Sequence, residues 1–348
     1  MIPSVKEIFK DSFKNSNGEY SNKLTQKEID LLFEHKLFKC FLSEKVNGLG
    51  LTIPQTLSII EDASYLNGSL GWLIQIGNGG NYFLTNFEEK IGIDLFSKKN
   101  AVIAGSGTAT TNAILIEGGV IVSGKWKFCS GSEYATLFTV TFKMGDSEEI
   151  KSGIIPRDEV KIIEDWKTVG MKNTSTNSIE IENVFIPNEH IFNVYAKKSF
   201  LDETVFKLPF IIYAQAFFIS VAFGIFKRLL DETENTMKES QTFNNRKSDR
   251  LLKMSNLNSK GLILLENAKK EISGIITDLI NQPTIDSNTS NQIQEKFIFH
   301  ANNMRTHSLE IFVIHGINVV YTESPINVFF NDLLAVTQHK LMNEVVQN

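Results

Sequence analysis

The stretch SGKWKFCSGS, from Ser123 to Ser132, combines hydroxyl, basic and aromatic residues with two glycines. Neither a buried strand, which is apolar throughout, nor a surface strand, which alternates apolar and polar residues, needs this mixture. Hydroxyls and glycines beside a Trp and a Phe therefore indicate a local requirement beyond pairing in a sheet. The stretch bears on the fold and on the function at once.

Short runs with strand character surround this stretch, from about residue 100 onward. They are rich in β-branched and aromatic residues, follow a period of two, and are separated by Gly, Pro and Asn. The runs are NAILIEGGVIVSGKWKF, ATLFTVTFKMG, IKSGIIPRDEVKII and NSIEIENVFIPNEHIF. This pattern predicts a compact antiparallel barrel or sandwich.

Helical patterns lie on both sides of the strand-rich region. Near the N-terminus, Thr25 with Glu28 three residues later has the sequence of a capping box. The helical period returns after Pro187 and lasts to the end, with one polar break, Asn281 to Asn291, that we interpret as an interhelical loop. The predicted fold class is α+β, with an N-terminal helical domain (1–95), a central β domain (96–195) and a C-terminal four-helix bundle (196–348).

Composition limits the classes of partner. The 348 residues carry a formal net charge of -5 with both signs interspersed, which argues against binding to nucleic acid or to an anionic membrane. Cys40 and Cys129 lack metal-site spacing and form no disulfide framework, so we expect no metal and a reducing cytoplasm. The first residues, MIPSVKEIFKDSF, contain charges and no apolar core of the kind a signal peptide needs.

The uncharged segment from Leu208 to Phe226 is long enough to be a candidate for a membrane span. Pro209, Gln215, Ser220 and Gly224 dilute its hydrophobicity, and an all-apolar helix is also typical of the centre of a bundle. We therefore interpret it as a bundle helix, and expect it to drive assembly into a homodimer or homotetramer.

Four stretches together resemble the acyl-CoA dehydrogenase fold, and in particular its oxygenase branch, the flavin-dependent monooxygenases of the 4-hydroxyphenylacetate hydroxylase type. Two of them, AGSGTAT with GGVIVSGKWKFCSGS and DWKTVGMKNTSTNSIEIENVFIPNEHIF, are specific in combination. The other two, NGSLGWLIQIGNGG and INVFFNDLLAVTQHK, are weak when taken alone. The resemblance implies a flavin, FMN or FAD, between the β domain and the bundle.

The resemblance also assigns candidate flavin contacts. A flavin ring is an apolar slab with a polar edge, which suits aromatic walls, a few hydroxyls and glycine. Ser130 would lie near the flavin N5 atom and stabilise the reduced form. The other implied flavin contacts are Trp72, Ser106, Trp126, Gly131, Thr174 and, at the phosphate, Arg246 with Lys247 and Arg250 as neighbours.

His339 matches the histidine that ends the last motif, and the resemblance implies that it takes a proton from the substrate. Asp332, seven residues earlier, would orient or neutralise a partner. Two departures stand out: Gly80 replaces a second active-site histidine, and Asn331 replaces an arginine. A dehydrogenase would need a carboxylate base, and the matching position is Tyr321, two residues from Glu323.

The predicted function is a two-component flavin-dependent monooxygenase for a small aromatic or natural-product substrate. A separate reductase would supply reduced flavin, because the chain has no Gly-x-Gly-x-x-Gly dinucleotide fingerprint. Two alternatives remain open. One is a dehydrogenase acting on an acyl thioester through Glu323, and the other is a non-catalytic binding protein that has kept the flavin fold.

Overall fold

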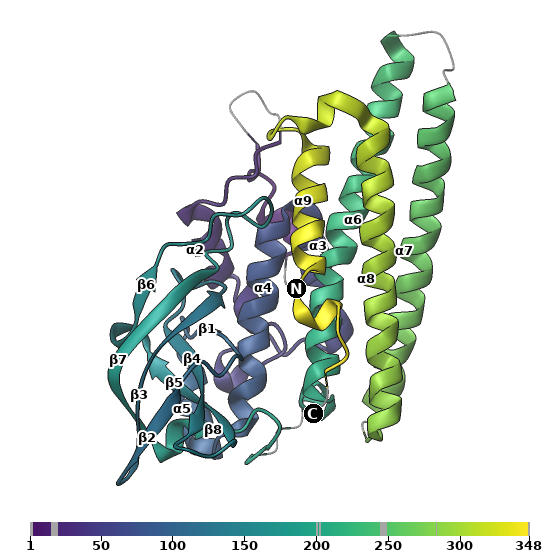
Figure 1. Ribbon diagram of the computed structural model, residues 1–348. Coiled ribbons are helices and arrows are strands. Elements are labelled where there is room, and N and C mark those ends of the chain that lie inside the picture. The colour runs from purple at the N-terminus through teal and green to yellow at the C-terminus, as the bar shows by residue number, and fades with distance from the viewer. Residues whose placement is uncertain are drawn as a thin grey trace.

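The computed structural model describes residues 3–14, 20–199, 201, 203–243, 249–282 and 284–346, without the side chains of 240–243. The strands gather in one lobe and the long helices stand beside them as a bundle (Figure 1). The prediction of an α+β fold is confirmed.

The N-terminal region is helical, as expected. Its helices are α1 (Val5–Ile8), α2 (Gln26–Glu34), α3 (Ile53–Leu66), α4 (Gly68–Asn81) and α5 (Glu89–Phe96), with 3-10 turns at Leu37–Lys39, Glu44–Val46 and Tyr82–Asn86. Thr25 and Glu28 form the predicted capping box at the start of α2. Asn67 caps the N-terminus of α4, because its side chain accepts a hydrogen bond from the backbone N–H of Leu70.

The strands form one sheet in the order β6-β7-β3-β2-β4-β5-β8, with β1 added on β4. The strands are β1 (Ile103–Gly105), β2 (Asn112–Ile116), β3 (Gly119–Cys129), β4 (Leu137–Met144), β5 (Ile150–Pro156), β6 (Lys161–Ile163), β7 (Asn177–Pro187) and β8 (Ile191–Phe192), with 3-10 turns at Arg157–Glu159 and Asn188–His190. The pairing is mostly antiparallel, but β4 pairs in parallel with both β1 and β2. The prediction of purely antiparallel pairing was therefore wrong at β4.

Four long helices follow. They are α6 (Phe210–Phe243), α7 (Asp249–Asn281), α8 (Ser287–His315) and α9 (Pro325–Thr337), with 3-10 turns at Thr204–Lys207, Gly316–Val320 (η7) and Lys340–Met342. The predicted loop at Asn281–Asn291 is shorter in the structure, because Asp286 caps α8 by accepting the backbone N–H of Thr289.

Helix α6 occupies the centre of the molecule. By length and composition Phe210–Glu239 could cross a membrane, yet 89% of its apolar window is buried inside the protein. A side chain at Gly224 would place its Cβ 2.1 Å from the carbonyl oxygen of Glu61, so glycine lets α6 pack directly on α3. This burial contradicts the expectation that α6 drives oligomerisation, because its apolar residues already contact the chain's own core.

Two apolar cores organise the fold. One lies within the strands, and the other joins the N-terminal helices to the bundle. At the second, the Arg228 guanidinium lies 5.2–5.3 Å from the ring centroids of Tyr20, Tyr65 and Phe329 and pairs with Glu232 at 2.6 Å. The division at residues 95 and 195 stays a prediction.

Candidate active site

The end of β3 leaves regular strand geometry just where the sequence becomes unusual. The pairing register with β7 shifts between Trp126 and Cys129, Phe128 has φ 65° and Gly131 has φ 76°. A positive φ suits glycine and strains phenylalanine, so the bend is built into the backbone. The turn that follows docks on the loop before β7, where the N–H of Gly131 donates to the carbonyl oxygen of Thr174 at 2.8 Å.

A hydrogen-bonded chain of side chains starts from this turn; we call it the hydroxyl chain. The Trp72 Nε1–H donates to Ser130 Oγ at 2.9 Å, and Ser130 Oγ lies 2.8 Å from Thr176 Oγ1. Thr176 Oγ1 lies 2.6 Å from Thr174 Oγ1, which donates to the carbonyl oxygen of Met171 at 2.9 Å. The chain brings together three of the predicted site residues, Trp72, Ser130 and Thr174, from α4 and two loops. Thr174 is fully buried, which contradicts the prediction that it contacts the flavin.

An aromatic pair lies next to the hydroxyl chain. Trp166 donates its Nε1–H to the same carbonyl oxygen of Met171 at 2.8 Å, and its ring meets Phe128 edge to face at 6.5 Å between centroids. Phe128 is 68% exposed, which is unusual for a phenylalanine unless something covers it. Sequence reasoning did not select Phe128, since strand alternation gave no signal of the bulge that turns it outward.

Trp126 was predicted to contact the flavin, and the structure contradicts this. Its side chain is fully buried in the core of the sheet, and its Nε1–H donates to the carbonyl oxygen of Thr141 at 2.9 Å. With both its ring and its only polar group already in contact with the sheet, Trp126 has nothing to offer a ligand.

Ser106 and Arg250 make their hydrogen bonds outside the hydroxyl chain. Ser106 follows β1 and is half-buried; its hydroxyl accepts from the N–H of Thr108, and its carbonyl oxygen accepts from Thr141. Arg246 and Lys247 lie outside the described residues. Arg250 already forms hydrogen bonds within the chain, since it donates to the carbonyl oxygens of Ile314 and His315 at the end of α8.

His339 follows the end of α9 and lies against the aromatic side chains of the site. Its ring stacks on Phe218 at 4.2 Å and lies 6.1 Å from the Trp72 ring. Burial lowers the pKa of His339 to about 4, so the ring is neutral at pH 7. Its Nδ1 accepts the backbone N–H of Leu341, which assigns the ring hydrogen to Nε2, and no described residue accepts that hydrogen.

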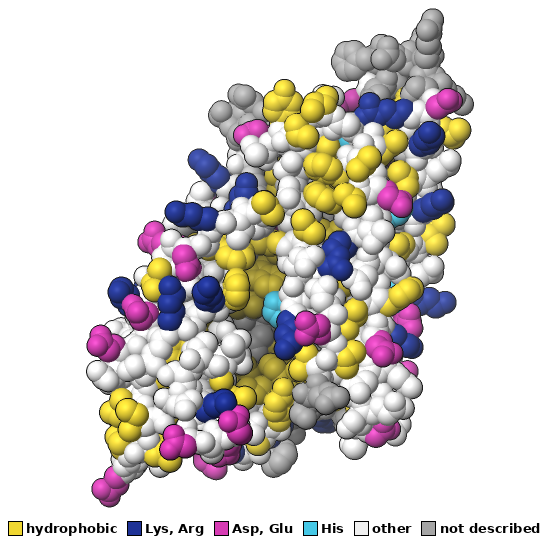
Figure 2. Space-filling view, in the orientation of Figure 1, with side chains coloured by type: hydrophobic (Ala, Val, Ile, Leu, Met, Phe, Trp, Pro, Cys, Tyr) yellow, Lys and Arg dark blue, Asp and Glu magenta, His cyan; other side chains and the backbone are white. Residues whose placement is uncertain are grey.

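A hollow lined with hydrophobic side chains runs between the strand lobe and the bundle, with a histidine at its edge (Figure 2). The residual exposure of Trp72, Ser130 and Thr176, 5–8%, places these side chains just beneath a surface. An apolar hollow beside a few hydrogen-bonding groups is the usual form of a site for a small aromatic ligand.

Asp332 connects α9 to the loop that carries Thr174. Its Oδ1 accepts the backbone N–H of Met171 at 2.6 Å, while its buried Oδ2 has no hydrogen-bond partner among the described residues. Burial raises the pKa of Asp332 to about 7. Met171 and Ser175 have φ of 54° and 45°, a conformation that persists only where neighbours hold it, and Asp332 supplies one such contact.

The two departures and the alternative base have clear positions. A Cβ at Gly80 would lie 2.8 Å from Cβ of Ile103, so the contact of α4 with β1 leaves no room for a histidine. Asn331 uses its amide to bond the carbonyl oxygen and side chain of Asn327. Glu323 is exposed and accepts from Thr322 at 2.8 Å, in contact with water.

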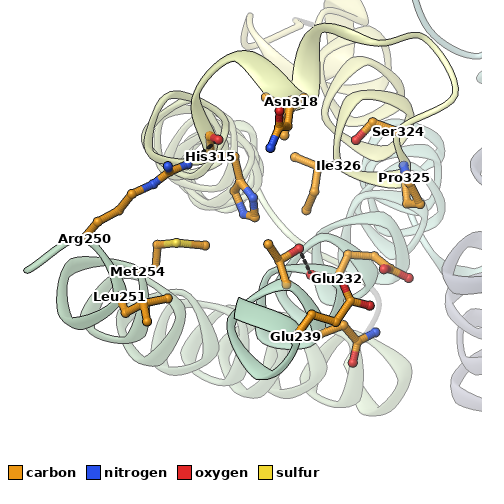
Figure 3. A pocket seen from close by; sticks show the side chains of 13 residues that line it. Glu232, Glu239, Arg250, Leu251, Met254, His315, Asn318, Ser324, Pro325 and Ile326 are labelled. Carbon is orange, nitrogen blue, oxygen red and sulfur yellow. Dashed lines mark hydrogen bonds between the residues drawn. The ribbon is translucent and has the colours of Figure 1, made fainter. Parts of the chain in front are cut away.

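A separate pocket of about 610 Å³ lies at the other end of α9, among α6, α7 and η7 (Figure 3). His315 lines it, and burial, with Arg250 nearby, lowers the pKa of this histidine to about 4. Arg250 donates to carbonyl oxygens at the end of α8, and Glu232 pairs with Arg228, so both side chains already have partners within the chain. None of its lining residues belongs to the hydroxyl chain.

Comparison with known proteins adds independent findings. No family model matches the chain. It is 25% identical over 339 residues to the indole-3-acetate monooxygenase of Pseudomonas putida, covering 94% of this chain and 87% of that protein. It is 23% identical over 244 residues to the oxygenase component of p-hydroxyphenylacetate 3-hydroxylase from Acinetobacter baumannii, covering 66% and 58%. The structure of XiaF from Streptomyces sp. with FADH2 and glycerol superposes with a TM-score of 0.81 at 15% identity, covering 98% and 88%.

Proposed function

We propose that this chain, which is related to the oxygenase components of two-component flavin-dependent monooxygenases and has their acyl-CoA dehydrogenase-like fold, oxygenates a small aromatic substrate with reduced flavin. The observation that carries the proposal is the hydroxyl chain, in which Ser130 accepts from Trp72 and bonds Thr176 while remaining 5% exposed.

The residues present fit a flavin ring. Phe128 and Trp166 offer aromatic walls beside the turn. Gly131 has no side chain, so a ligand can approach the backbone there, and Ser130 offers one hydroxyl oxygen. Reduced flavin, when bound, supplies the electrons that activate dioxygen. Ser130 would hold the polar edge of the ring, and Thr174 would hold Ser130 in place through Thr176. The ring is common to FMN and FAD, so the proposal covers both.

His339 would meet the substrate in the role of a hydrogen-bond donor. Its Nδ1 is occupied by the N–H of Leu341, so the group left for a ligand is the Nε2–H. The initial prediction, that His339 takes a proton from the substrate, would require that bond to break. A donor at this position would instead orient a phenolic or carboxylate oxygen of an aromatic substrate.

A separate reductase would deliver the reduced flavin. The proposed compartment is the cytoplasm, because the buried thiols of Cys40 and Cys129 stay reduced there.

We also propose that the chain forms a homodimer or homotetramer. Support comes from large apolar residues exposed on α7, on α8, on η7 and directly after η7 rather than from α6. These residues are Leu252, Ile263, Phe299, Leu309, Val313, Ile317, Val320 and Tyr321.

The direct test is binding followed by turnover. The purified protein is titrated without oxygen against reduced and oxidised FMN and FAD, and the reduced complex is then mixed with isotopically labelled dioxygen and indole-3-acetate or 4-hydroxyphenylacetate as probes. Incorporation of one labelled oxygen atom into a probe is the expected result. A chain that binds neither flavin would be a non-catalytic relative, and the proposal would be wrong.

A dehydrogenase acting through Glu323 remains the second candidate from the sequence, and the exposure of that side chain argues against it. The variant Glu323→Gln separates the two functions. An acyl thioester should bleach the flavin of a dehydrogenase, and the variant should abolish that bleaching; for an oxygenase the substitution should leave oxygen incorporation unchanged.

A further inference from the structure

The hydroxyl chain has a fixed direction, because its two ends are of opposite kind. The Trp72 indole nitrogen can only donate, and the carbonyl oxygen of Met171 can only accept. Three hydroxyls lie between them, each with a single hydrogen, and they must serve the remaining links. Four hydrogens for four links leave one arrangement: Trp72 donates to Ser130, Ser130 to Thr176, Thr176 to Thr174, and Thr174 to Met171.

This direction fixes what Ser130 can do. Its hydrogen is donated to Thr176, and one of its lone pairs accepts from Trp72. A single lone pair therefore remains to accept a hydrogen bond from a ligand. Thr174 is fully buried, and Ser130 and Thr176 are 5% and 6% exposed, so water has little access to replace a link. If the Ser130 hydroxyl turned its hydrogen toward a ligand, the link to Thr176 would break and leave buried hydroxyls unpaired. That loss is larger than the gain from one new hydrogen bond.

We propose that the direction of the hydroxyl chain makes Ser130 a pure acceptor and so selects reduced flavin over oxidised flavin. The inference rests on the proposed function, since it concerns the same site. With the N5 edge of the ring at Ser130, the placement that the resemblance implies, reduced flavin would donate its N5 hydrogen to Ser130. Oxidised flavin has a lone pair there, and the two acceptors repel. Thr176 and Thr174 are therefore specificity-determining residues although the hydroxyl of Thr174 is too deeply buried to contact a ligand.

The test measures dissociation constants for FMN in both redox states, without oxygen and without substrate. In Thr176→Val the acceptor of the Ser130 hydrogen is gone, so that hydrogen is free to turn to the N5 lone pair of oxidised FMN. Oxidised FMN should then bind about tenfold more tightly, the worth of one hydrogen bond. Binding of reduced FMN should stay close to that of the unmodified protein, since the Ser130 lone pair remains.

A second variant and a matched control keep the test decisive. In Thr174→Val, Thr176 loses its acceptor and can donate to Ser130 instead, which also frees the Ser130 hydrogen; the same shift toward oxidised FMN is expected. Ser132→Ala removes a hydroxyl of the same turn that bonds Ser175 outside the hydroxyl chain. Its ratio of the two dissociation constants should equal that of the unmodified protein.

The outcomes separate the inference from the proposed function. If the unmodified protein binds reduced FMN more tightly and both valine variants keep its ratio of dissociation constants, the inference is wrong while the function stands. If either valine variant folds but binds reduced and oxidised FMN equally more weakly, the hydroxyl chain only supports the structure, and the inference is likewise wrong. If the unmodified protein binds FMN in neither state, the function falls and the inference falls with it.

Discussion

His339 illustrates how a neighbouring group changes the role of a residue. An exposed imidazole has a pKa of about 6.5 and is a general base. Burial against Phe218 lowers the pKa of His339 to about 4, and the N–H of Leu341 occupies its basic nitrogen. The residue type was predictable from the sequence, but its tautomer and its pKa depend on contacts that only the folded chain provides.

We expect His339→Gln, which keeps a side-chain donor, to retain more activity than His339→Phe, which keeps the volume and loses the donor. The loss of kcat/KM in the phenylalanine variant should be about tenfold or more, the worth of a hydrogen bond to a polar substrate group. Because the ring is neutral above about pH 4, activity should show no inflection near pH 6.5 that belongs to His339. An inflection there that vanishes in His339→Gln would contradict this.

Gly79 and Gly80, adjacent in α4, should respond oppositely to alanine. A Cβ at Gly80 would meet Cβ of Ile103 at 2.8 Å, so Gly80→Ala should lower the free energy of unfolding by about 1–3 kcal/mol through overpacking. At Gly79 the nearest atom is Nε2 of Gln75 at 3.7 Å, and Gly79→Ala should raise stability by about 0.5–1 kcal/mol through helix propensity. Urea denaturation of the two variants measures both effects, and a loss of similar size in both would refute the packing argument.

At the scale of elements, the sequence predicted most of the helices and the strand-rich region, because periodicity records which face is buried. It failed at the end of β3. In a regular strand Trp126, Phe128 and Ser130 would share one face. The shift in register between Trp126 and Cys129 separates them, with Trp126 in the sheet core and Phe128 exposed. A bulge depends on how two distant strands meet, and the local sequence does not reveal it.

The contact between α9 and the Met171 loop predicts a pH effect. The pKa of Asp332 is raised to about 7, so the folded state keeps a proton that the unfolded state releases near pH 4. The stability that Asp332 contributes is therefore present below about pH 4 and lost as the pH rises to 7, by up to about 4 kcal/mol. The charge of Lys172 opposes this effect by lowering the pKa of Asp332, and Asp332 in turn raises the pKa of Tyr20.

Asp332→Asn keeps an acceptor for the Met171 N–H and does not titrate. When the pH is raised from 5 to 8, the difference in the free energy of unfolding between this variant and the unmodified protein should therefore shift in favour of the variant. Asp332→Ala leaves that N–H unpaired and should be less stable at both values. Urea denaturation at the two pH values provides the measurement. If the unmodified protein and Asp332→Asn differ by the same amount at both, Asp332 does not titrate in this range.

At the scale of the whole molecule, the uncharged helix was correctly interpreted as a bundle helix and wrongly assigned to the oligomer interface. Hydrophobicity alone does not distinguish an apolar helix within the chain from one between chains. The apolar residues exposed on α7, α8 and η7 are better placed to meet a second copy.

Leu309 and Val313 lie one turn apart on α8 and are 52% and 68% exposed. The double variant Leu309→Glu, Val313→Glu should reduce the mass measured by light scattering to that of a smaller assembly or a monomer, because charges would be buried without partners. Ile93→Glu, on the exposed side of α5, is the control and should leave the mass unchanged. An unchanged mass in the double variant would place the interface elsewhere.

The cluster around Arg228 has a consequence for how the protein acquires its activity. Tyr20 and Phe329, whose rings lie 5.2 Å apart, are separated by most of the chain, and the same is true of Trp72 and His339. Contacts at such separation form late in folding and make it slow. During synthesis, the segment with Tyr20 leaves the ribosome long before its partner in α9 exists. The active site is therefore complete only when the two ends of the chain meet, because until then Trp72 has no contact with His339.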